Sequence, residues 1–126
     1  MELILDTHSH TIASAHAYST VTELAQAAAD KGLKLLAVTD HAPALSDSSP
    51  LLHFMNYHVL PKQIKGVEML YGVELNILDF EGHTDMPEDI LQRQDICIAS
   101  FHTECTKPGT LEENTRPFWG PWTIPM

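Results

Sequence analysis

Four hydrophobic runs of this sequence each lead into residues that could bind a metal ion or transfer a proton. The runs are residues 3–7, 33–39, 67–75 and 96–101, and the polar residues at or near their ends are His8 and His10, Asp40 and His41, Glu74, and His102. Each run is almost continuously hydrophobic, which is typical of a strand covered on both faces of a parallel sheet. Because the carboxyl ends of parallel strands meet at one edge of a sheet, we expect these side chains to lie together there.

The spacing of His8 and His10 suits two ligands of one metal ion. Residues two apart on an extended chain point to the same side, about 6–7 Å apart along the backbone, and two imidazoles so placed can bind one ion. Asp6 points the same way and could orient one of the rings. A single histidine at a strand end is more often a hydrogen-bonded structural residue, so the prediction of a metal site depends on the four strand ends together.

Two further residues extend this predicted site. His16 lies in a loop rich in small residues after the first run, and such a loop could fold back over the strand ends. Glu74 supplies a carboxylate, which is the usual bridging group when two divalent ions lie about 3.5–4 Å apart. The residue types therefore favour divalent cations, and zinc, manganese and iron all accept imidazole and carboxylate ligands.

The segments between the runs predict helices. A capping-box pattern begins at Thr20 and Gly32 follows as a stop, which predicts a helix between them. Residues 51–64 are expected to form a second helix that Pro61 bends or ends, and a short third helix with proline at its first position is expected over residues 87–91. Strands that alternate with helices predict an α/β fold of parallel strands with flanking helices, either a sheet or part of a barrel.

Composition and charge set further limits. The chain has 126 residues, of which 44% are hydrophobic and 19% charged, as expected of one domain with a core. The formal net charge of −10 argues against binding nucleic acid or an anionic membrane by bulk electrostatics, and no run approaches the roughly 18 apolar residues of a membrane-spanning helix. An acidic residue near the start argues against export and two cysteines are too few for a disulfide scaffold, so we expect a cytoplasmic location.

The last twenty residues differ from the rest of the chain. Residues 107–126 hold four of the eight prolines and both tryptophans, and they show no helix or strand period. We therefore expect a partial domain over residues 1–106, followed by an atypical Pro/Trp-rich tail over residues 107–126 that results from a truncation or a frameshift. An ordinary docking tail is the alternative.

The strand-end motifs resemble those of the PHP family, the polymerase and histidinol phosphatase domains. The matching stretches are Asp-Thr-His-Ser-His-Thr (6–11), Thr-Asp-His (39–41), Gly-Val-Glu-Leu-Asn (72–76) and Ser-Phe-His (100–102). Residues 16–19 and 53–56 are also similar to the small stand-alone bacterial phosphatases of the family, and the resemblance covers roughly residues 1–115. It implies a distorted (β/α)7 barrel, of which this chain would be the N-terminal part.

The resemblance also implies a set of metal ligands. Members of the family hold up to three divalent ions, often zinc or manganese, and hydrolyse phosphate esters. Carried over to this sequence, one ion would take His8, His10 and Glu74, a second His16 and His41, and a third Glu74 and His102, with Glu74 as the bridge. In the family each ion takes one more ligand from later in the barrel, in segments that this sequence does not contain.

The function implied by the resemblance is that of a metal-dependent phosphatase. It would hydrolyse a small phosphate monoester with a metal-activated water, and Asp40 and His41 are the expected catalytic residues. Either could assist proton transfer, although Asp40 could instead orient a metal ligand.

Two alternatives remain open. The first is a metal-binding fragment with impaired catalysis, because about half of the barrel would be absent; the exposed edge of its sheet could also pair with a second copy of the chain. The second is a metal-dependent amidohydrolase, which also starts from two histidines two apart. This second class usually needs a carboxylated lysine or a later pair of histidines, and neither Lys31 nor Lys34 lies at the end of a predicted strand.

Overall fold

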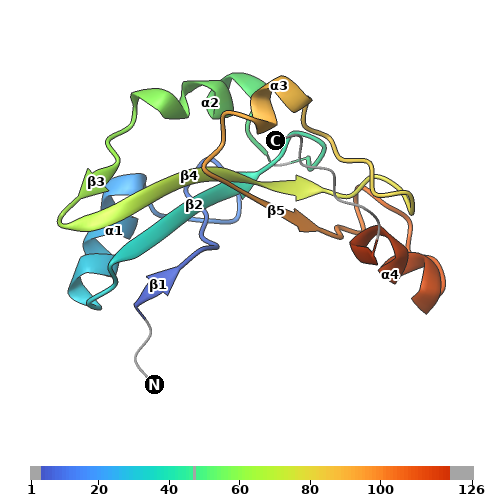
Figure 1. Ribbon diagram of the computed structural model, residues 1–126, viewed down its shortest axis with the longest axis horizontal. Coiled ribbons are helices and arrows are strands. Elements are labelled where there is room, and N and C mark those ends of the chain that lie inside the picture. Colours follow the sequence, from blue (N-terminus) through green and yellow to red (C-terminus); the bar gives the residue numbers. More distant parts are fainter. Residues whose placement is uncertain (1–3, 47, 120–126) are drawn as a thin grey trace.

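Four parallel strands form the centre of the structure and end at a common edge. The computed structural model describes residues 4–46 and 48–119. The parallel strands are β1 (Leu5–Asp6), β2 (Leu35–His41), β4 (Val67–Asn76) and β5 (Ile96–Ser100), side by side in that order. The short β3 (Gln63–Ile64) pairs antiparallel with the start of β4 (Figure 1). The predicted fold, parallel strands with flanking helices in part of a barrel, is confirmed.

The register of β4 with its neighbours decides which residues meet. His41 on β2 lies opposite Glu74 on β4, and Asn76 on β4 lies opposite Ser100 on β5. Side chains that are paired in register on parallel strands point to the same side of the sheet, and they alternate along each strand. The carboxyl ends of β2, β4 and β5 therefore lie together, as the sequence predicted.

The two faces of the sheet have different roles. Alternate residues of β2 and β4 belong to one core with residues of three helices; the core includes Val38, Tyr71, Val73, Ala25, Phe54 and Ile90. This face is the helix-covered face, and Asp40 shares the direction of Val38 on β2. His41, Glu74 and Asn76 fall on the alternate positions and point to the other, inner face. The sheet thus separates the two neighbours Asp40 and His41.

The first helix forms as predicted. Helix α1 (Val21–Asp30) is capped by Thr20, whose side chain accepts a hydrogen bond from the amide of Glu23, while the Glu23 carboxylate accepts one from the amide of Thr20. This reciprocal capping box satisfies two amide groups that the first turn leaves without partners. Gly32 follows with φ of +78°, a backbone conformation that favours glycine.

The second predicted helix ends earlier than residue 64. Helix α2 (Leu51–Met55) continues as the 3-10 helix η1 (Asn56–Val59), and Leu60 is extended with ψ of 145° because it precedes Pro61. A hairpin to β4 follows, and its two turn residues Lys65 and Gly66 have φ of 53° and 82°. Two positive φ values are typical of the tight turn that joins antiparallel strands. The strand β3 therefore occupies residues that were predicted as the end of the second helix.

The structure also corrects the predictions for the later helices. Helix α3 (Glu88–Leu91) has Pro87 as its N-cap residue rather than as its first helical residue. Helix α4 (Leu111–Trp119) lies in the segment that showed no period. The amide of Glu113 donates to Thr110 Oγ1 and the amide of Thr110 donates to the Glu113 carboxylate, a capping pattern that signals this helix. Residues 120–126 of the predicted tail lie outside the described residues.

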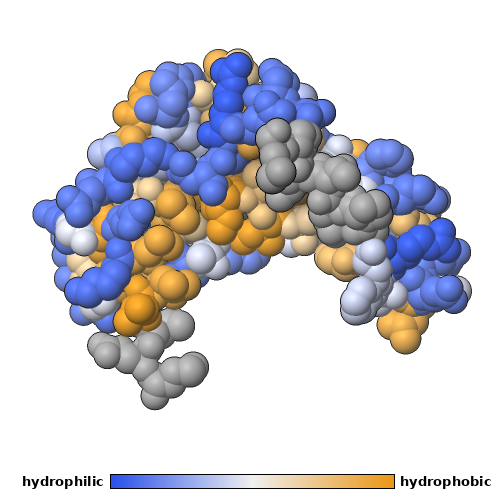
Figure 2. Space-filling view, viewed as in Figure 1, coloured by the Kyte–Doolittle hydropathy of each residue, from blue (hydrophilic) through white to orange (hydrophobic). Residues whose placement is uncertain are grey.

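The sheet curves into an arch, and hydrophobic residues gather along part of its inner side (Figures 1 and 2). Ile4 and Leu5 at β1 are 50% and 45% exposed. Cys97 on β5 is exposed as well, although it lies within one of the hydrophobic runs of the sequence. The core helices pack over β2 and β4 and leave this position of β5 open. Within the described ranges, the helices lack the combination of length and apolar character that crossing a bilayer requires.

Gly72 allows β5 to approach β4. A Cβ atom at this position would lie 1.9 Å from the backbone oxygen of Ile96 and 2.6 Å from its side chain. We predict that Gly72→Ala forces β5 away and lowers the free energy of unfolding by about 1–3 kcal/mol or more, as overpacking does. Urea denaturation measures this loss. Glu68→Ala, at an exposed position of the same strand, should change stability by less than about 0.5 kcal/mol, and equal effects would contradict the prediction.

Candidate metal centre

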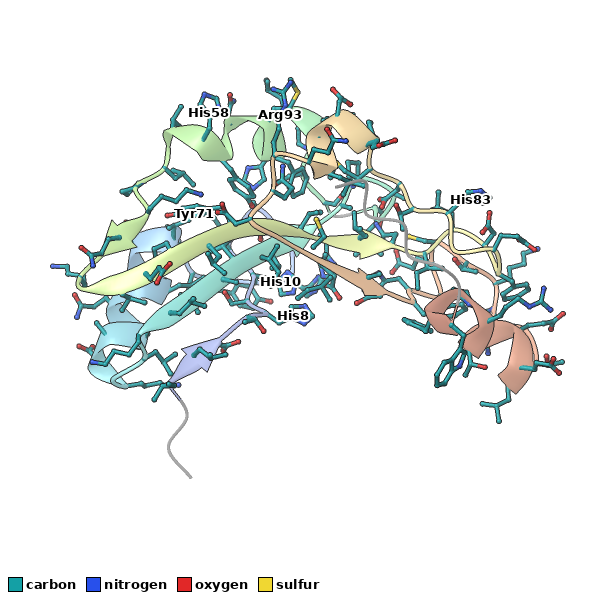
Figure 3. The ribbon with its side chains drawn as sticks, in the orientation of Figure 1. His8, His10, His58, Tyr71, His83 and Arg93 are labelled. Atoms are coloured by element: carbon teal, nitrogen blue, oxygen red, sulfur yellow. The ribbon has the colours of Figure 1, made fainter. Side chains whose placement is uncertain are left out.

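The carboxylate of Glu74 is the centre of the site. Its side chain is 6% exposed, and its Oε2 atom lies 3.2 Å from His8 Nε2, 3.2 Å from His10 Nε2 and 3.0 Å from His41 Nδ1. Its Oε1 atom lies 3.5 Å from His102 Nε2. One carboxylate therefore gathers four imidazoles that follow or end three different strands. Figure 3 shows His8 and His10 close together beyond the end of β1.

His16 joins the cluster through His41. The loop after β1 brings His16 Nε2 to 3.1 Å from His41 Nε2, and the rings of His10 and His41 stack with their centroids 4.4 Å apart. Zinc–nitrogen bonds of about 2.0–2.1 Å would place two nitrogen ligands roughly 3.3–3.4 Å apart. The separation of the two Nε2 atoms is thus close to that of two ligands of one ion.

The side chains fit divalent cations. His8, His10 and Glu74 form one group whose ligand atoms lie within 4.8 Å of one another, and His41, Glu74 and His102 form a second. Within the described part of the chain, the buried His41 Nδ1 and Glu74 Oε2 have no hydrogen-bond partner although they lie 3.0 Å apart. Such a pair of orphaned acceptors and donors is expected where an ion completes the site.

Electrostatics keep Glu74 ionised. Burial raises the pKa of Glu74, but the imidazoles of His10 and His41 lower it by more, and the pKa lies far below its ordinary value of 4.5. The carboxylate of Glu74 is therefore negatively charged at neutral pH. A carboxylate oxygen next to imidazole nitrogens is a ligand set that zinc, manganese and iron accept.

Asp40 has a different environment from the ligand cluster. Its side chain is 1% exposed and faces the loop after β1, where it accepts hydrogen bonds from the Thr11 amide and hydroxyl (both 2.8 Å) and from the Ser14 hydroxyl (2.8 Å). The Tyr57 hydroxyl donates to it from 3.1 Å, and His53 Nε2 lies 3.4 Å away. Asp40 thus ties the loop that carries His16 to β2 and η1.

The same contacts explain the pKa of Asp40. Burial raises the pKa, but the hydrogen bonds from His53, Thr11 and Ser14 outweigh burial and lower the pKa from 3.8 to about 2. Burial beside this carboxylate raises the pKa of Tyr57 far above 10.0, so its hydroxyl stays protonated and donates. Thr11, Ser14 and Tyr57 were not among the predicted site residues, although Thr11 stands in the first quoted motif.

Other histidines lie away from the cluster. His53 contacts Asp40 on the helix-covered face, whereas His58 and His83 are exposed and point away from the body of the protein (Figure 3). His83 Nδ1 pairs with Asp79 at 2.6 Å. The structure therefore brings together all six residues that the sequence predicted as ligands, and it separates them from the remaining histidines.

A cavity of about 350 Å³ opens beside the cluster. Its lining residues are His16, His41, Leu45, Phe101, His102, Thr103 and Glu104. Three of the candidate ligands thus form part of its wall. No lysine or arginine is among these described lining residues, and Glu104 adds a negative charge.

Fold and site together define an α/β protein with a candidate divalent-cation centre at the carboxyl edge of its sheet. The family model described as "PHP domain" matches residues 6–117. The chain therefore belongs to the PHP domain family, as the motifs predicted.

Curated relatives carry a consistent description. The chain is 51% identical over 115 residues to a protein of Acetivibrio thermocellus named "Probable phosphatase". The aligned residues cover 91% of this chain and 48% of that protein. It is 53% identical over 117 residues to a "Probable phosphatase" of Thermoanaerobacter sp. (strain X514), covering 92% and 48%. A "Probable phosphatase" of Clostridium novyi is 50% identical over 115 residues, covering 91% and 47%. The chain spans about half the length of these curated relatives.

The first test of the centre removes the charge of Glu74. We predict that Glu74→Gln weakens zinc or manganese binding by at least about 10–100-fold, the range seen when only a supporting residue is lost. Elemental analysis and calorimetric titration of the purified chain measure this. Glu68→Gln removes one charge from an exposed position of the same strand and should leave binding unchanged. Equal affinity in both variants would contradict the assignment.

A second test concerns Asp40. An asparagine offers one acceptor oxygen where the carboxylate meets donors on both oxygens, so we predict that Asp40→Asn lowers the free energy of unfolding by roughly 1.5–3 kcal/mol. Chemical denaturation at neutral pH measures the loss. Asp30→Asn, an exposed residue that accepts from Gln26, is the control and should change stability by less than about 0.5 kcal/mol.

The difference between Asp40→Asn and the unsubstituted chain should depend on pH. A carboxylate with a lowered pKa stabilises the fold above its unfolded-state pKa, and that stabilisation is lost as the pH falls through the folded-state value. For Asp40 the interval runs from 3.8 down to about 2. The difference in stability should narrow as the pH falls through this interval, and a constant difference would contradict the prediction.

Proposed function

We propose that the chain carries the metal-binding part of a phosphatase that hydrolyses a small phosphate monoester by metal-activated water. The observation that carries this proposal is the single buried carboxylate of Glu74 facing four imidazoles at 3.0–3.5 Å. The family and the name shared by the relatives support the same class of reaction.

Six residues would hold the ions. The two groups that share Glu74 would account for two ions, and His16 with His41 would contribute to a third. We propose zinc, with manganese and iron as alternatives, because imidazole and carboxylate ligands suit all three. When bound, divalent ions lower the pKa of a coordinated water, which supplies the nucleophile, and neutralise charge on the phosphoryl oxygens.

The cavity beside the cluster would receive the phosphate group. Because its described wall offers no lysine or arginine and includes Glu104, attraction of a phosphate depends on the ions and the imidazoles. His41 contributes to this wall and could contact the reacting phosphoryl group. Asp40, buried among fixed donors, would act by positioning the loop of Thr11 and Ser14 rather than by accepting a proton from the substrate.

Two alternative functions are metal binding without turnover and amide hydrolysis. A chain that binds metal without turnover is favoured by the site itself, where His16 and His41 face each other as a set of two ligands and catalytic zinc usually has three. An amidohydrolase is disfavoured, because Lys31 and Lys34 precede β2 and so lie at the opposite end of that strand from His41. Pairing of the open sheet through β1 or β5, the cytoplasmic location and the boundary at residue 106 stay predictions.

Turnover of p-nitrophenyl phosphate by the 126-residue chain, with zinc or manganese added, tests the proposal. We expect hydrolysis that a chelator abolishes and that Glu74→Gln lowers by at least about 100-fold, since each 1.4 kcal/mol of lost stabilisation is a factor of ten. Glu68→Gln is the matched control. Bound metal without hydrolysis of any phosphate monoester would contradict the phosphatase and support the metal-binding alternative.

A further inference from the structure

We propose that Asn76 and Ser14 are positioning residues that fix the tautomers of His102 and His10, so that Nδ1 of each ring carries the proton and Nε2 is left free for an ion. These two residues belong to the surroundings of the proposed metal site, and their effect on metal binding rests on the proposed function. It concerns which nitrogen of each ring can act as a ligand, because a neutral imidazole has one donor and one acceptor nitrogen.

The amide of Asn76 can be oriented from its partners alone. The side chain is fully buried, and its Nδ2 atom lies 3.0 Å from the backbone oxygen of Ala42 and 2.7 Å from Asp85 Oδ2. A carbonyl and a carboxylate only accept hydrogen bonds, so this end of the amide must be the NH₂ group and both of its hydrogens are used. The Oδ1 atom is therefore the acceptor that faces His102 Nδ1 at 2.7 Å.

Asp85, in the loop that follows β4, stabilises this orientation of the amide. Its Oδ1 accepts from the Asn76 amide at 2.9 Å, and its Oδ2 accepts from Asn76 Nδ2 and from the Ala44 amide at 2.7 Å. Three N–H groups thus converge on one carboxylate, and a flipped Asn76 would turn its oxygen toward that carboxylate. Because Asn76 can only accept from His102, the ring must be protonated on Nδ1, and its Nε2 faces Glu74 Oε1 at 3.5 Å.

Ser14 imposes the same choice on His10. The buried Ser14 hydroxyl donates its single hydrogen to Asp40 Oδ1 at 2.8 Å and accepts from the His41 amide at 3.1 Å. A hydroxyl has one hydrogen and two lone pairs, so the remaining contact, to His10 Nδ1 at 3.4 Å, must be one in which His10 donates. His10 Nε2 is then left toward Glu74 Oε2 at 3.2 Å.

The two sets of contacts are built from different elements and serve the same end. A carboxylate, Asp85 or Asp40, orders a neutral polar side chain, and that side chain accepts a hydrogen bond from Nδ1–H of a candidate ligand. In metalloproteins, a ligating histidine donates a hydrogen bond from its second ring N–H to such a partner, and loss of the partner weakens metal binding about 10–100-fold. The separation of the two sets allows each to serve as the control for the other.

Nitrogen NMR of the metal-free 126-residue chain tests the tautomers directly. With ¹⁵N-labelled histidine at alkaline pH, where imidazoles are neutral, we expect Nδ1 of His102 and His10 to resonate as protonated nitrogens and Nε2 as unprotonated ones. Signals are assigned by their loss in His102→Gln and His10→Gln. Protonation on Nε2, or averaging between the two forms in the unsubstituted chain, would overturn the proposal without any positioning variant having to fold.

Two variants then test the positioning residues. Asp85→Asn should release the Asn76 amide and shift the His102 nitrogens toward an average of both tautomers while leaving those of His10 unchanged. Ser14→Ala should do the reverse. Each should weaken zinc binding about 10–100-fold, and Asp79→Asn, an exposed carboxylate paired with His83, should leave both readouts unchanged.

The outcomes separate this proposal from the proposed function. Fixed tautomers that the two variants release, together with unaltered zinc affinity, would overturn the role in metal binding. Fixed tautomers in a chain that binds zinc but hydrolyses no phosphate ester would support the positioning residues and contradict the phosphatase. Weaker zinc binding with tautomers that do not change would show a general structural effect and overturn the proposal.

Discussion

The buried carboxylate of Glu74 is the constraint on which the rest of the structure depends. Three imidazole nitrogens lie within 3.2 Å of its Oε2 atom, more than the two lone pairs of one oxygen can serve in good geometry. A buried charge is costly unless it is paired and hydrogen-bonded, and the buried Oε2 atom has no hydrogen-bond partner among the described residues. Cations between the carboxylate and the rings would remove this conflict. Because β4 lies between β2 and β5, Glu74 can meet imidazoles from both sides of its strand.

Neighbouring residues of β2 show how one strand serves two purposes. Asp40 and His41 are adjacent in sequence but point to opposite faces of the sheet. Asp40 accepts hydrogen bonds from hydroxyl and amide groups, whereas His41 lies next to Glu74. The hydrogen bonds to Asp40 hold the loop that carries His16 against β2. The partners of Glu74 are imidazoles, whose nitrogens can bind either a proton or a metal ion. The two carboxylates thus differ in role because their partners differ, although both have lowered pKa values.

Much of this arrangement could be predicted from the sequence, and the exceptions have physical causes. Buried parallel strands leave continuous hydrophobic runs, so the strand ends and the six candidate ligands were visible. The strand β3 has only two residues and is signalled by its turn rather than by a run, and α4 is signalled by Thr110 and Glu113 rather than by a hydrophobic period. The exposure of Cys97 depends on which helices cover which strands, and the partners of Asn76 depend on a loop that returns from residue 85. Neither relation is encoded locally.

The open position of Cys97 has a practical consequence. Its backbone pairs with that of Val73, the residue before Glu74, so the thiol lies close to the centre in the sheet while pointing to the opposite face from the ligands. A spectroscopic label attached to this sulfur would therefore sense any molecule that comes to lie over β5, and it would do so without touching a histidine. Cys97 therefore offers an attachment point on β5 from which the binding of another molecule over this strand can be followed.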